Sequence, residues 1–326
     1  MKELVILIPV FNDWESVGLL LPRIEAAVAA ISWRVRVLLV DDGSTAAAPE
    51  TVESRLPVEI LHLRRNLGHQ RAIAIGLYEV AEHTVADAVV IMDGDGEDRA
   101  EDVPRLVAEF ERAGEREIVF AARTRRHESL VFQVSYHSYR ALHWLLTGKT
   151  VRVGNFSVVP REALRRLMVV SDLWNHYAAA VFRARLEYRT LPLERGVRLS
   201  GNPQMNYASL LVHGLSAISV FSDTVGARLL LVSGALAGVV AVLLAAFPWT
   251  PLGTALLVMA ALQAVTFATL FAFTIISGRS QMSFLPLRDA AYFIMGRRAC
   301  GGTRDSLRSL GEAVDEGSRA AIRERV

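Results

Sequence analysis

The sequence is poor in cysteine and lysine, and these shortages narrow the class of protein. Cys300 is the only cysteine among 326 residues, so an internal disulfide framework is excluded and the chain fits a reducing compartment. Lys2 and Lys149 are the only lysines, which makes the basic side chains almost entirely arginine. The formal net charge of +2 says little about partners, and no nucleic-acid partner is expected.

Common nucleotide and calcium motifs are also missing. The sequence has no Walker A motif and no G-x-G-x-x-G after its first apolar run, which excludes the usual P-loop and dinucleotide cradles. The acidic stretch VVIMDGDGED (89–98) begins with EF-hand spacing, but Asp98 replaces the turn glycine and Pro104 replaces the bidentate glutamate. What remains is an open carboxylate pair, Asp93 and Asp95, suited to Mg or Mn that shares its positions with phosphate oxygens.

The first 125 residues alternate short β-rich runs with helical patterns. This rhythm predicts an α/β fold with a mostly parallel sheet and helices on both faces. In such a sheet, ligands bind beyond the carboxyl ends of the strands. The predicted strands begin at Leu4, Val35, Val58, Ala88 and Glu117, and the predicted helices cover 15–31, 69–82 and 101–113.

Polar motifs follow four of these runs in succession. They are PVFND (9–13), VDDGS (40–44), RRNLGHQRA (64–72) and MDGDGED (92–98). Each alone would fit an ordinary turn, because Asp, Asn and Gly favour turns. Four in succession at the same sheet edge predict a single binding site.

Two later runs carry no charged residue, at 229–247 and 252–276. Each is long enough to cross a bilayer as a helix, which takes about 20 residues, so we predict a transmembrane hairpin. Arg228 precedes the first run and Arg279 follows the second, which places both flanks in the cytoplasm by the positive-inside rule. Nothing in the first residues suggests export.

These patterns divide the chain into four predicted parts. An α/β domain covers residues 1–200, and a juxtamembrane amphipathic segment covers 201–224. The two transmembrane helices lie within 225–278. A cytoplasmic tail of one or two helices covers 279–326.

The four polar motifs together resemble the inverting family 2 glycosyltransferases of the GT-A fold. The subgroup indicated is the polyprenyl-phosphate and dolichyl-phosphate sugar synthases, and the resemblance covers the whole chain. It includes GNFSVV (154–159) and the late membrane hairpin. The D-x-D element alone is a weak signal, and its combination with DDGS and the hairpin is a strong one.

The resemblance implies roles for individual residues in residues 1–200. Asp93 and Asp95 would meet the ribose, the diphosphate and the metal, with Glu97 as a further metal contact where relatives often carry Gln. Asp95 and Arg123 would act in catalysis, Arg123 as a phosphate-binding residue. The nucleoside pocket would be lined by Pro9, Val10, Asn12, Glu15, Asp41 and Asp42.

The acceptor phosphate would be met by arginines that lie between the catalytic loop and the membrane runs. The candidates are Arg140, Arg195 and Arg198. Relatives often carry Gly-x-Ser-Lys ahead of the juxtamembrane helix, whereas this chain has GNPQMN (201–206). The phosphate contact is therefore expected to have moved to Arg195 or Arg198.

The resemblance implies inverting, metal-dependent transfer of a sugar from a UDP- or GDP-sugar to a polyprenyl phosphate. A phosphate monoester with a second pKa near 6 is largely a dianion at neutral pH, so no strong general base is required. In a bacterium the acceptor would be undecaprenyl phosphate. The protein would be integral to the inner membrane, with its catalytic domain in the cytoplasm.

Two alternatives stay open at this point, namely a membrane-anchored glycosyltransferase with a different acceptor and a non-catalytic scaffold that binds nucleotide sugars. A homo-oligomer is also left open. The sequence does not identify the sugar.

Overall fold

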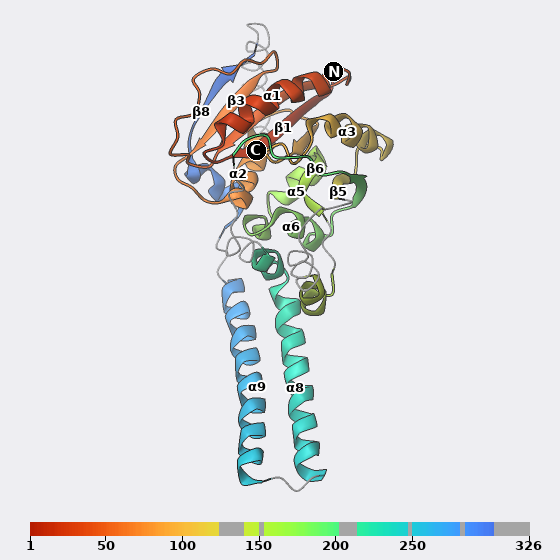
Figure 1. Cartoon of the computed structure of the whole chain (residues 1–326), viewed down its shortest axis with the longest axis vertical. Helices are drawn as coiled ribbons and strands as arrows, with labels where there is room; N and C mark the ends of the chain where they lie inside the picture. The colour runs from red at the N-terminus through yellow and green to blue at the C-terminus, as the bar shows by residue number, and fades with distance from the viewer. Residues whose placement is uncertain (124–139, 150–152, 202–213, 247–249, 281–283, 303–326) are drawn as a thin grey trace, which may run out of the picture. The chain divides into compact units, whose positions relative to one another are not determined.

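The computed structural model describes residues 1–123, 140–149, 153–201, 214–246, 250–280 and 284–302, without the side chains of 123, 272–273 and 275–280. The chain forms two compact units, which are drawn in Figure 1. Unit 1 comprises residues 1–127, 151–206 and 284–326, and unit 2 comprises 128–150 and 207–283. Unit 1 is therefore assembled from three separate stretches of chain.

Unit 1 is built on an eight-stranded sheet with the order β7-β5-β6-β4-β1-β2-β3-β8. Strands β3, β2, β1 and β4 are parallel neighbours. Antiparallel pairings join β4 to β6, β6 to β5 and β3 to β8, while β5 and β7 are parallel. The strands are β1 (Glu3–Val10), β2 (Arg34–Asp41), β3 (Val58–Leu63), β4 (Ala88–Ile91), β5 (Ile118–Arg123), β6 (Val153–Pro160), β7 (Tyr188–Leu193) and β8 (Ile294–Gly301).

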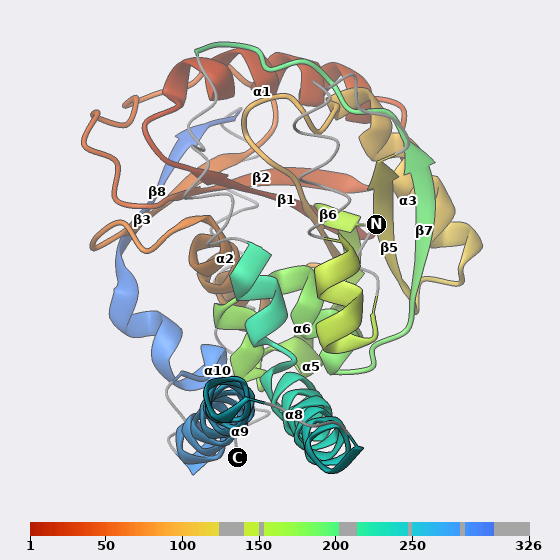
Figure 2. The same ribbon diagram turned by 60° about the horizontal axis from the view of Figure 1, so that its bottom comes forward.

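Helices cover both faces of this sheet (Figure 2). One face packs on α1 (Trp14–Val28), the short helix η1 (Ala100–Asp102) and α3 (Val103–Arg112). The other packs on α2 (His69–His83), α5 (Arg161–Leu167), η2 (Ser171–Trp174) and α6 (Tyr177–Arg183). Successive β1 residues point to opposite faces, and Leu4 and Val5 are both buried. Because both faces are covered, the strands read as continuous apolar runs, and the predicted α/β fold with helices on both faces of the sheet is confirmed.

The chain after α9 differs from the helical tail predicted from the sequence. It forms two short helices, α10 (Pro286–Asp289) and η3 (Ala290–Phe293), and then β8. β8 pairs antiparallel with β3, which would otherwise present an open sheet edge. Residues 303–326 lie outside the described chain.

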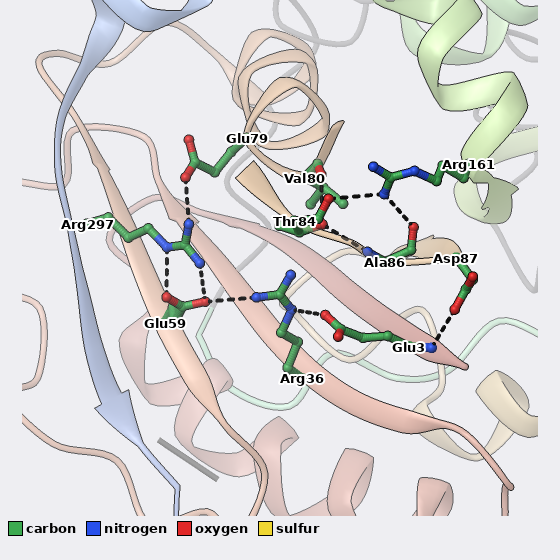
Figure 3. A network of polar contacts seen from close by, with 10 residues as sticks. All are labelled: Glu3, Arg36, Glu59, Glu79, Val80, Thr84, Ala86, Asp87, Arg161 and Arg297. Carbon is green, nitrogen blue, oxygen red and sulfur yellow. Dashed lines mark hydrogen bonds and ion pairs between the residues drawn. The ribbon is translucent and has the colours of Figure 1, made fainter. Parts of the chain in front are cut away.

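A buried ionic network fastens β8 to the sheet (Figure 3). Arg297 donates to both carboxylate oxygens of Glu59, at 2.7 and 2.6 Å, and to Glu79 at 2.8 Å. Arg36 binds Glu3 at 2.9 Å and approaches Glu59 at 3.6 Å. Since buried carboxylates require compensation, Arg297 supplies from β8 a charge that β3 and α2 need.

Unit 2 contains two long apolar helices, α8 (Ser222–Ala246) and α9 (Pro251–Ser280). They run side by side in Figure 1, and the hydroxyl of Ser233 donates to the carbonyl of Ala264 at 3.3 Å. By length and composition, both could cross a membrane, and only 11% and 6% of their most apolar windows is buried. The helices overlap the predicted spans at 229–247 and 252–276, of which residue 247 lies outside the described chain. Of the predicted juxtamembrane segment, 214–219 is helical and 202–213 lies outside the described residues.

Candidate active site

The carboxyl ends of β1, β2 and β4 lie side by side at one edge of the sheet. Val10 pairs with Asp41 between β1 and β2, and Leu7 pairs with Ile91 between β1 and β4. The polar residues that follow these strands are therefore brought to the same edge. The sequence-based expectation of convergence at this edge rests on the same parallel pairing.

Asn12 ties the loop after β1 to the loop after β2. Its side-chain oxygen accepts hydrogen bonds from the backbone N–H groups of Thr45 and Ala46, both at 2.9 Å. Its own N–H donates to the hydroxyl of Ser44 at 2.9 Å. Asn12 has φ 52°, a left-handed conformation that Asn adopts more readily than most residues.

The other residues predicted to line the nucleoside pocket with Asn12 differ in their exposure to solvent. Pro9 and Val10 are buried at the end of β1. Glu15 is exposed in the first turn of α1.

The neighbouring carboxylates Asp41 and Asp42 have different partners. Asp41 accepts a hydrogen bond from the N–H of Ser44 at 2.9 Å, and its other oxygen lies 2.8 Å from Nδ1 of His62. Asp42 accepts from the N–H groups of Leu67 and Gly68, both at 2.8 Å. Burial raises the pKa of Asp42, and these two N–H groups oppose the rise. Asp42 thus holds the loop that leads into α2.

The carboxylate loop, residues 93–98, is ordered by its own hydrogen bonds. The buried Asp98 accepts from the N–H of Asp93 at 2.9 Å, and Asp95 accepts from the N–H of Glu97 at 3.0 Å. Gly96 sits at the turn with φ 85°, a left-handed conformation that favours glycine. The loop therefore presents Asp93 and Asp95 from a fixed backbone.

Residues 195–199, which we term the strap, dock onto the carboxylate loop. The N–H of Gly196 donates to the carbonyl of Glu97 at 2.8 Å, and that of Leu199 donates to the carbonyl of Asp95 at 2.8 Å. The Leu199 side chain covers Gly96, where an added Cβ would lie 2.4 Å from the Cγ of Leu199. Backbone pairing and this close approach together fix the register between the two segments.

The strap contains two of the three arginines predicted to bind the acceptor phosphate, and both form ion pairs with carboxylates. Arg198 places Nη1 3.0 Å from Oδ2 of Asp95 and Nη2 2.5 Å from Oδ2 of Asp13, and Arg195 forms an ion pair with Glu97. The contact made by Asp13 was not predicted from the sequence.

The remaining predicted arginines, Arg140 and Arg123, belong to other parts of the chain. Arg140 belongs to unit 2, in a helical stretch at 140–147. Arg123 ends β5, and its side chain lies outside the described part of the chain.

The negative charge of the loop suits a hard cation. Burial raises the pKa of Asp95, the neighbouring charge of Asp93 raises it further, and Arg198 and Arg195 oppose the rise. Within the described residues, no group of three or more His, Cys, Asp or Glu side chains is arranged as a metal site, and Glu97 faces Arg195. Two carboxylates fit Mg or Mn, because such ions keep several positions for water and phosphate oxygens.

His69 is a site residue for which the sequence indicates no role. Its Nε2 lies 3.2 Å from Oδ1 of Asp93 and 2.9 Å from Nδ2 of Asn155, and Gln70 donates to the Asn155 side chain at 3.0 Å. Burial lowers the pKa of His69, but the carboxylate of Asp93 more than offsets this and the pKa is raised. The only sequence signal is the position of His69 at the start of α2, in the NLGHQRA motif.

The sequence of this chain is similar to those of known glycosyltransferases. The family model for glycosyl transferase family 2 matches residues 5–168. Undecaprenyl-phosphate 4-deoxy-4-formamido-L-arabinose transferase of Yersinia enterocolitica is 32% identical over 183 residues, which cover 54% of this chain and 52% of the relative. Dodecaprenyl-phosphate galacturonate synthase of Rhizobium johnstonii is 36% identical over 117 residues, which cover 34% and 33%. The chain thus spans about half, or less, of the length of these curated relatives.

Solved structures are similar at lower identity. Glucosyl-3-phosphoglycerate synthase of Mycobacterium tuberculosis, in complex with Mn2+, UDP-glucose and phosphoglyceric acid, is 15% identical with a TM-score of 0.49, covering 69% of this chain and 80% of that one. Mannosyl-3-phosphoglycerate synthase of Rubrobacter xylanophilus is 16% identical with a TM-score of 0.46, covering 67% and 72%.

Proposed function

The chain belongs to glycosyl transferase family 2, and we propose that it transfers a sugar from a nucleoside diphosphate sugar to a polyprenyl phosphate. The observation that carries this proposal is the contact between the carboxylate loop and the strap. It puts oxygens that bind cations beside guanidinium groups that bind phosphates. Two curated relatives are named for undecaprenyl phosphate and dodecaprenyl phosphate, which supports a lipid phosphate as the acceptor.

The donor nucleoside, from UDP or GDP, is proposed to bind between the loops after β1 and β2. Asn12 joins these loops, and Asp41 offers a carboxylate to an N–H of the base. Pro9 and Val10 would form the floor, and Glu15 would contact the nucleoside from the start of α1. Asp42 would act indirectly, since it accepts two backbone N–H groups.

Asp93 and Asp95 would hold a Mg or Mn ion, with Glu97 as a further contact. A bound ion would neutralise charge on the leaving diphosphate. The raised pKa of Asp95 supports this assignment, because a cation relieves the cost of a second buried negative charge beside Asp93. Arg123 is proposed to bind the same diphosphate.

The reaction is proposed to be a single in-line displacement. An oxygen of the lipid phosphate attacks the anomeric carbon, the bond from that carbon to the diphosphate oxygen breaks, and the electron pair leaves on the nucleoside diphosphate. The configuration at the anomeric carbon inverts, so an α-linked donor gives a β-linked product. The phosphate is already largely a dianion at neutral pH, so the protein aligns the reactants and stabilises charge.

Arginines are proposed to orient the acceptor phosphate. Arg198 and Arg195 lie on the carboxylates of the loop, where a phosphate oxygen could replace a carboxylate as their partner. The acceptor role predicted for Arg140, which belongs to unit 2, stays a prediction. A guanidinium group suits this task because its N–H fork binds two oxygens at once.

We propose that α8 and α9 insert into the inner membrane as a hairpin. The segments before α8 and after α9 both contribute strands to one sheet, β7 and β8, so the chain has to cross an even number of times. Arg228 and Arg279 flank the two helices. The positive-inside rule then puts unit 1 in the cytoplasm.

The proposed function is tested by following label from a panel of UDP- and GDP-sugars into lipid, with purified protein in detergent and Mg or Mn. Undecaprenyl phosphate is compared with undecaprenol, which lacks the phosphate, and with no lipid. A labelled glycolipid formed only with the phosphorylated lipid is the expected result. Donor hydrolysis without lipid product would show that the acceptor is wrong, and binding of a donor without any turnover would favour the scaffold that binds nucleotide sugars without catalysis.

A further inference from the structure

Strand β8 reaches the segment that follows β2. Residues 43–57 contain no helix or strand, so they depend on neighbours for their shape. Arg298 donates to the carbonyl of Pro49 at 2.6 Å and to that of Glu50 at 2.9 Å. The N–H of Val52 donates to the carbonyl of Cys300 at 2.8 Å. The strand that follows the two apolar helices thus fastens one side of the proposed donor pocket.

Arg298 also reaches Asp41 through a histidine. Its Nε lies 3.2 Å from Nε2 of His62, and Nδ1 of His62 lies 2.8 Å from Oδ2 of Asp41. A guanidinium group can only donate hydrogen bonds, so Nε2 accepts and the ring proton is on Nδ1, which donates to Asp41. The side chains of His62 and Asp41 are 16% and 9% exposed, which shields this chain of hydrogen bonds from water.

The contacts of Asp41 fix its carboxylate from two directions. One oxygen accepts from the N–H of Ser44, and the other is held by His62. Each carboxylate oxygen has a second lone pair, so Asp41 can still accept a hydrogen bond from a ligand. A side chain already held in place loses less entropy when a ligand binds.

We propose that Arg298 is a positioning residue for the donor nucleoside, acting on Asp41 through His62 and on residues 49–50 through their carbonyl groups. This inference rests on the proposed function, because it requires Asp41 to bind the base. It makes nucleotide affinity depend on β8, a strand made only after both apolar helices. The donor site is therefore complete only when the chain has returned to unit 1.

The inference is tested with full-length protein in detergent, by calorimetric titration with UDP and with GDP in the presence of Mn2+. Arg298→Gln should raise the Kd of the preferred nucleotide about tenfold, and His62→Gln about threefold, as expected for lost hydrogen bonds. The double variant should bind about as weakly as Arg298→Gln alone, because the two side chains act in one chain of contacts. Arg298→Lys should recover part of the loss, since lysine still donates.

Arg288→Gln is the matched control, since Arg288 lies in the same returning segment and pairs with its neighbour Asp289. It should leave the Kd unchanged. In every variant the affinity for Mn2+ without nucleotide should also stay unchanged, which separates a positioning role from general damage to the fold.

Three results would overturn the inference. If wild type binds nucleotide and Arg298→Gln binds equally well, the inference fails and the proposed function stands. If the effects of Arg298→Gln and His62→Gln multiply in the double variant, the two residues do not act through Asp41 together. If wild type binds neither UDP nor GDP, the proposed function fails and takes the inference with it.

Discussion

The guanidinium of Arg198 binds the carboxylate of Asp95, with 3.0 Å between Nη1 and Oδ2. The same guanidinium also binds Asp13. A side chain from the strap therefore already neutralises the loop to which we assign a cation. A metal at Oδ2 of Asp95 has to share this oxygen with Arg198 or displace it, whereas Oδ1 accepts only the N–H of Glu97 among the contacts of the described residues.

Arg198→Gln is expected to tighten the binding of Mn2+ in the absence of nucleotide. The variant removes a positive charge that competes for Asp95, and the gain should be about fivefold, which corresponds to about 1 kcal/mol of ion-pair energy. The free Mn2+ signal in electron paramagnetic resonance measures this directly. Arg99→Gln is the control, because Arg99 pairs with Glu101 and Glu194, outside the carboxylate loop. Weaker Mn2+ binding by Arg198→Gln would show that the arginine supports the metal.

Substitutions of the neighbouring residues Asp41 and Asp42 should have different effects, one mainly on nucleotide affinity and the other mainly on the stability of the fold. Asp41→Asn is expected to weaken nucleotide binding and to lower the Tm less than Asp42→Asn, because its backbone donor Ser44 is partly exposed, whereas Leu67, a donor to Asp42, is buried. Asp42→Asn is expected to destabilise unit 1 by about 1–3 kcal/mol, the cost of an unsatisfied buried N–H, since Leu67 and Gly68 each donate to a different oxygen. Calorimetric titration and thermal unfolding of both variants provide the comparison. Equal effects on both quantities would contradict the assignment.

Arg297→Met is expected to destabilise the protein by about 3 kcal/mol or more, because it leaves Glu59 and Glu79 as buried carboxylates without their shared cation. The Arg297 side chain is only 16% exposed, so water cannot replace it. Thermal unfolding of the full chain in detergent measures the change. Arg288→Met is the control for the loss of a more exposed arginine in the same segment. A Tm close to that of wild type would show that β8 does not depend on this network.

The pair of His83 and Glu79 predicts a pH-dependent part of stability. The carboxylate of Glu79, whose oxygen lies 3.2 Å from Nδ1, raises the pKa of His83 above its usual value, with burial and Arg297 opposing. A raised pKa in the folded state adds stability below the unfolded value of about 6.5, and this stability is lost as the pH rises through the folded value.

His83→Gln should therefore lower the Tm more at about pH 6 than at about pH 9, by about 1–2 °C because the side chain is partly exposed. Thermal unfolding of wild type and variant at both pH values measures this difference. A difference that grew towards alkaline pH would contradict the assignment.

Much of unit 1 could be predicted from the sequence, for physical reasons. Strands β1 to β5 are buried on both faces or end in turn-forming motifs. Their apolar composition and the turn residues that follow them therefore identify them in the sequence. Parallel pairing then brings the polar motifs to one edge. The pairing of β8 with β3 could not be predicted, because the contact between Arg297 and Glu59 joins residues 238 positions apart.

For the candidate site, the sequence indicated which types of residue gather there, but it did not indicate which of them contact one another. The pair Asp93 and Asp95 could be proposed from local spacing, because both stand in one loop after one strand. The ion pairs that Arg195 and Arg198 make with this loop depend on how the strap crosses it. The position of His69 beside Asp93 likewise depends on the packing of α2 against β4. Local patterns contain no information on such distant approaches.

The most direct test of the account measures transfer of labelled sugar to undecaprenyl phosphate by wild type and Asp95→Asn, side by side, with Mn2+ and with EDTA. Wild type should form a glycolipid in which the anomeric configuration of the donor is inverted, and EDTA should abolish it. Asp95→Asn should remain folded and lose about a hundredfold or more in rate, as when one group that stabilises transition-state charge is removed. Retention of configuration would contradict the single in-line displacement, and an Asp95→Asn rate close to that of wild type would contradict the assignment of the carboxylate loop as the catalytic centre.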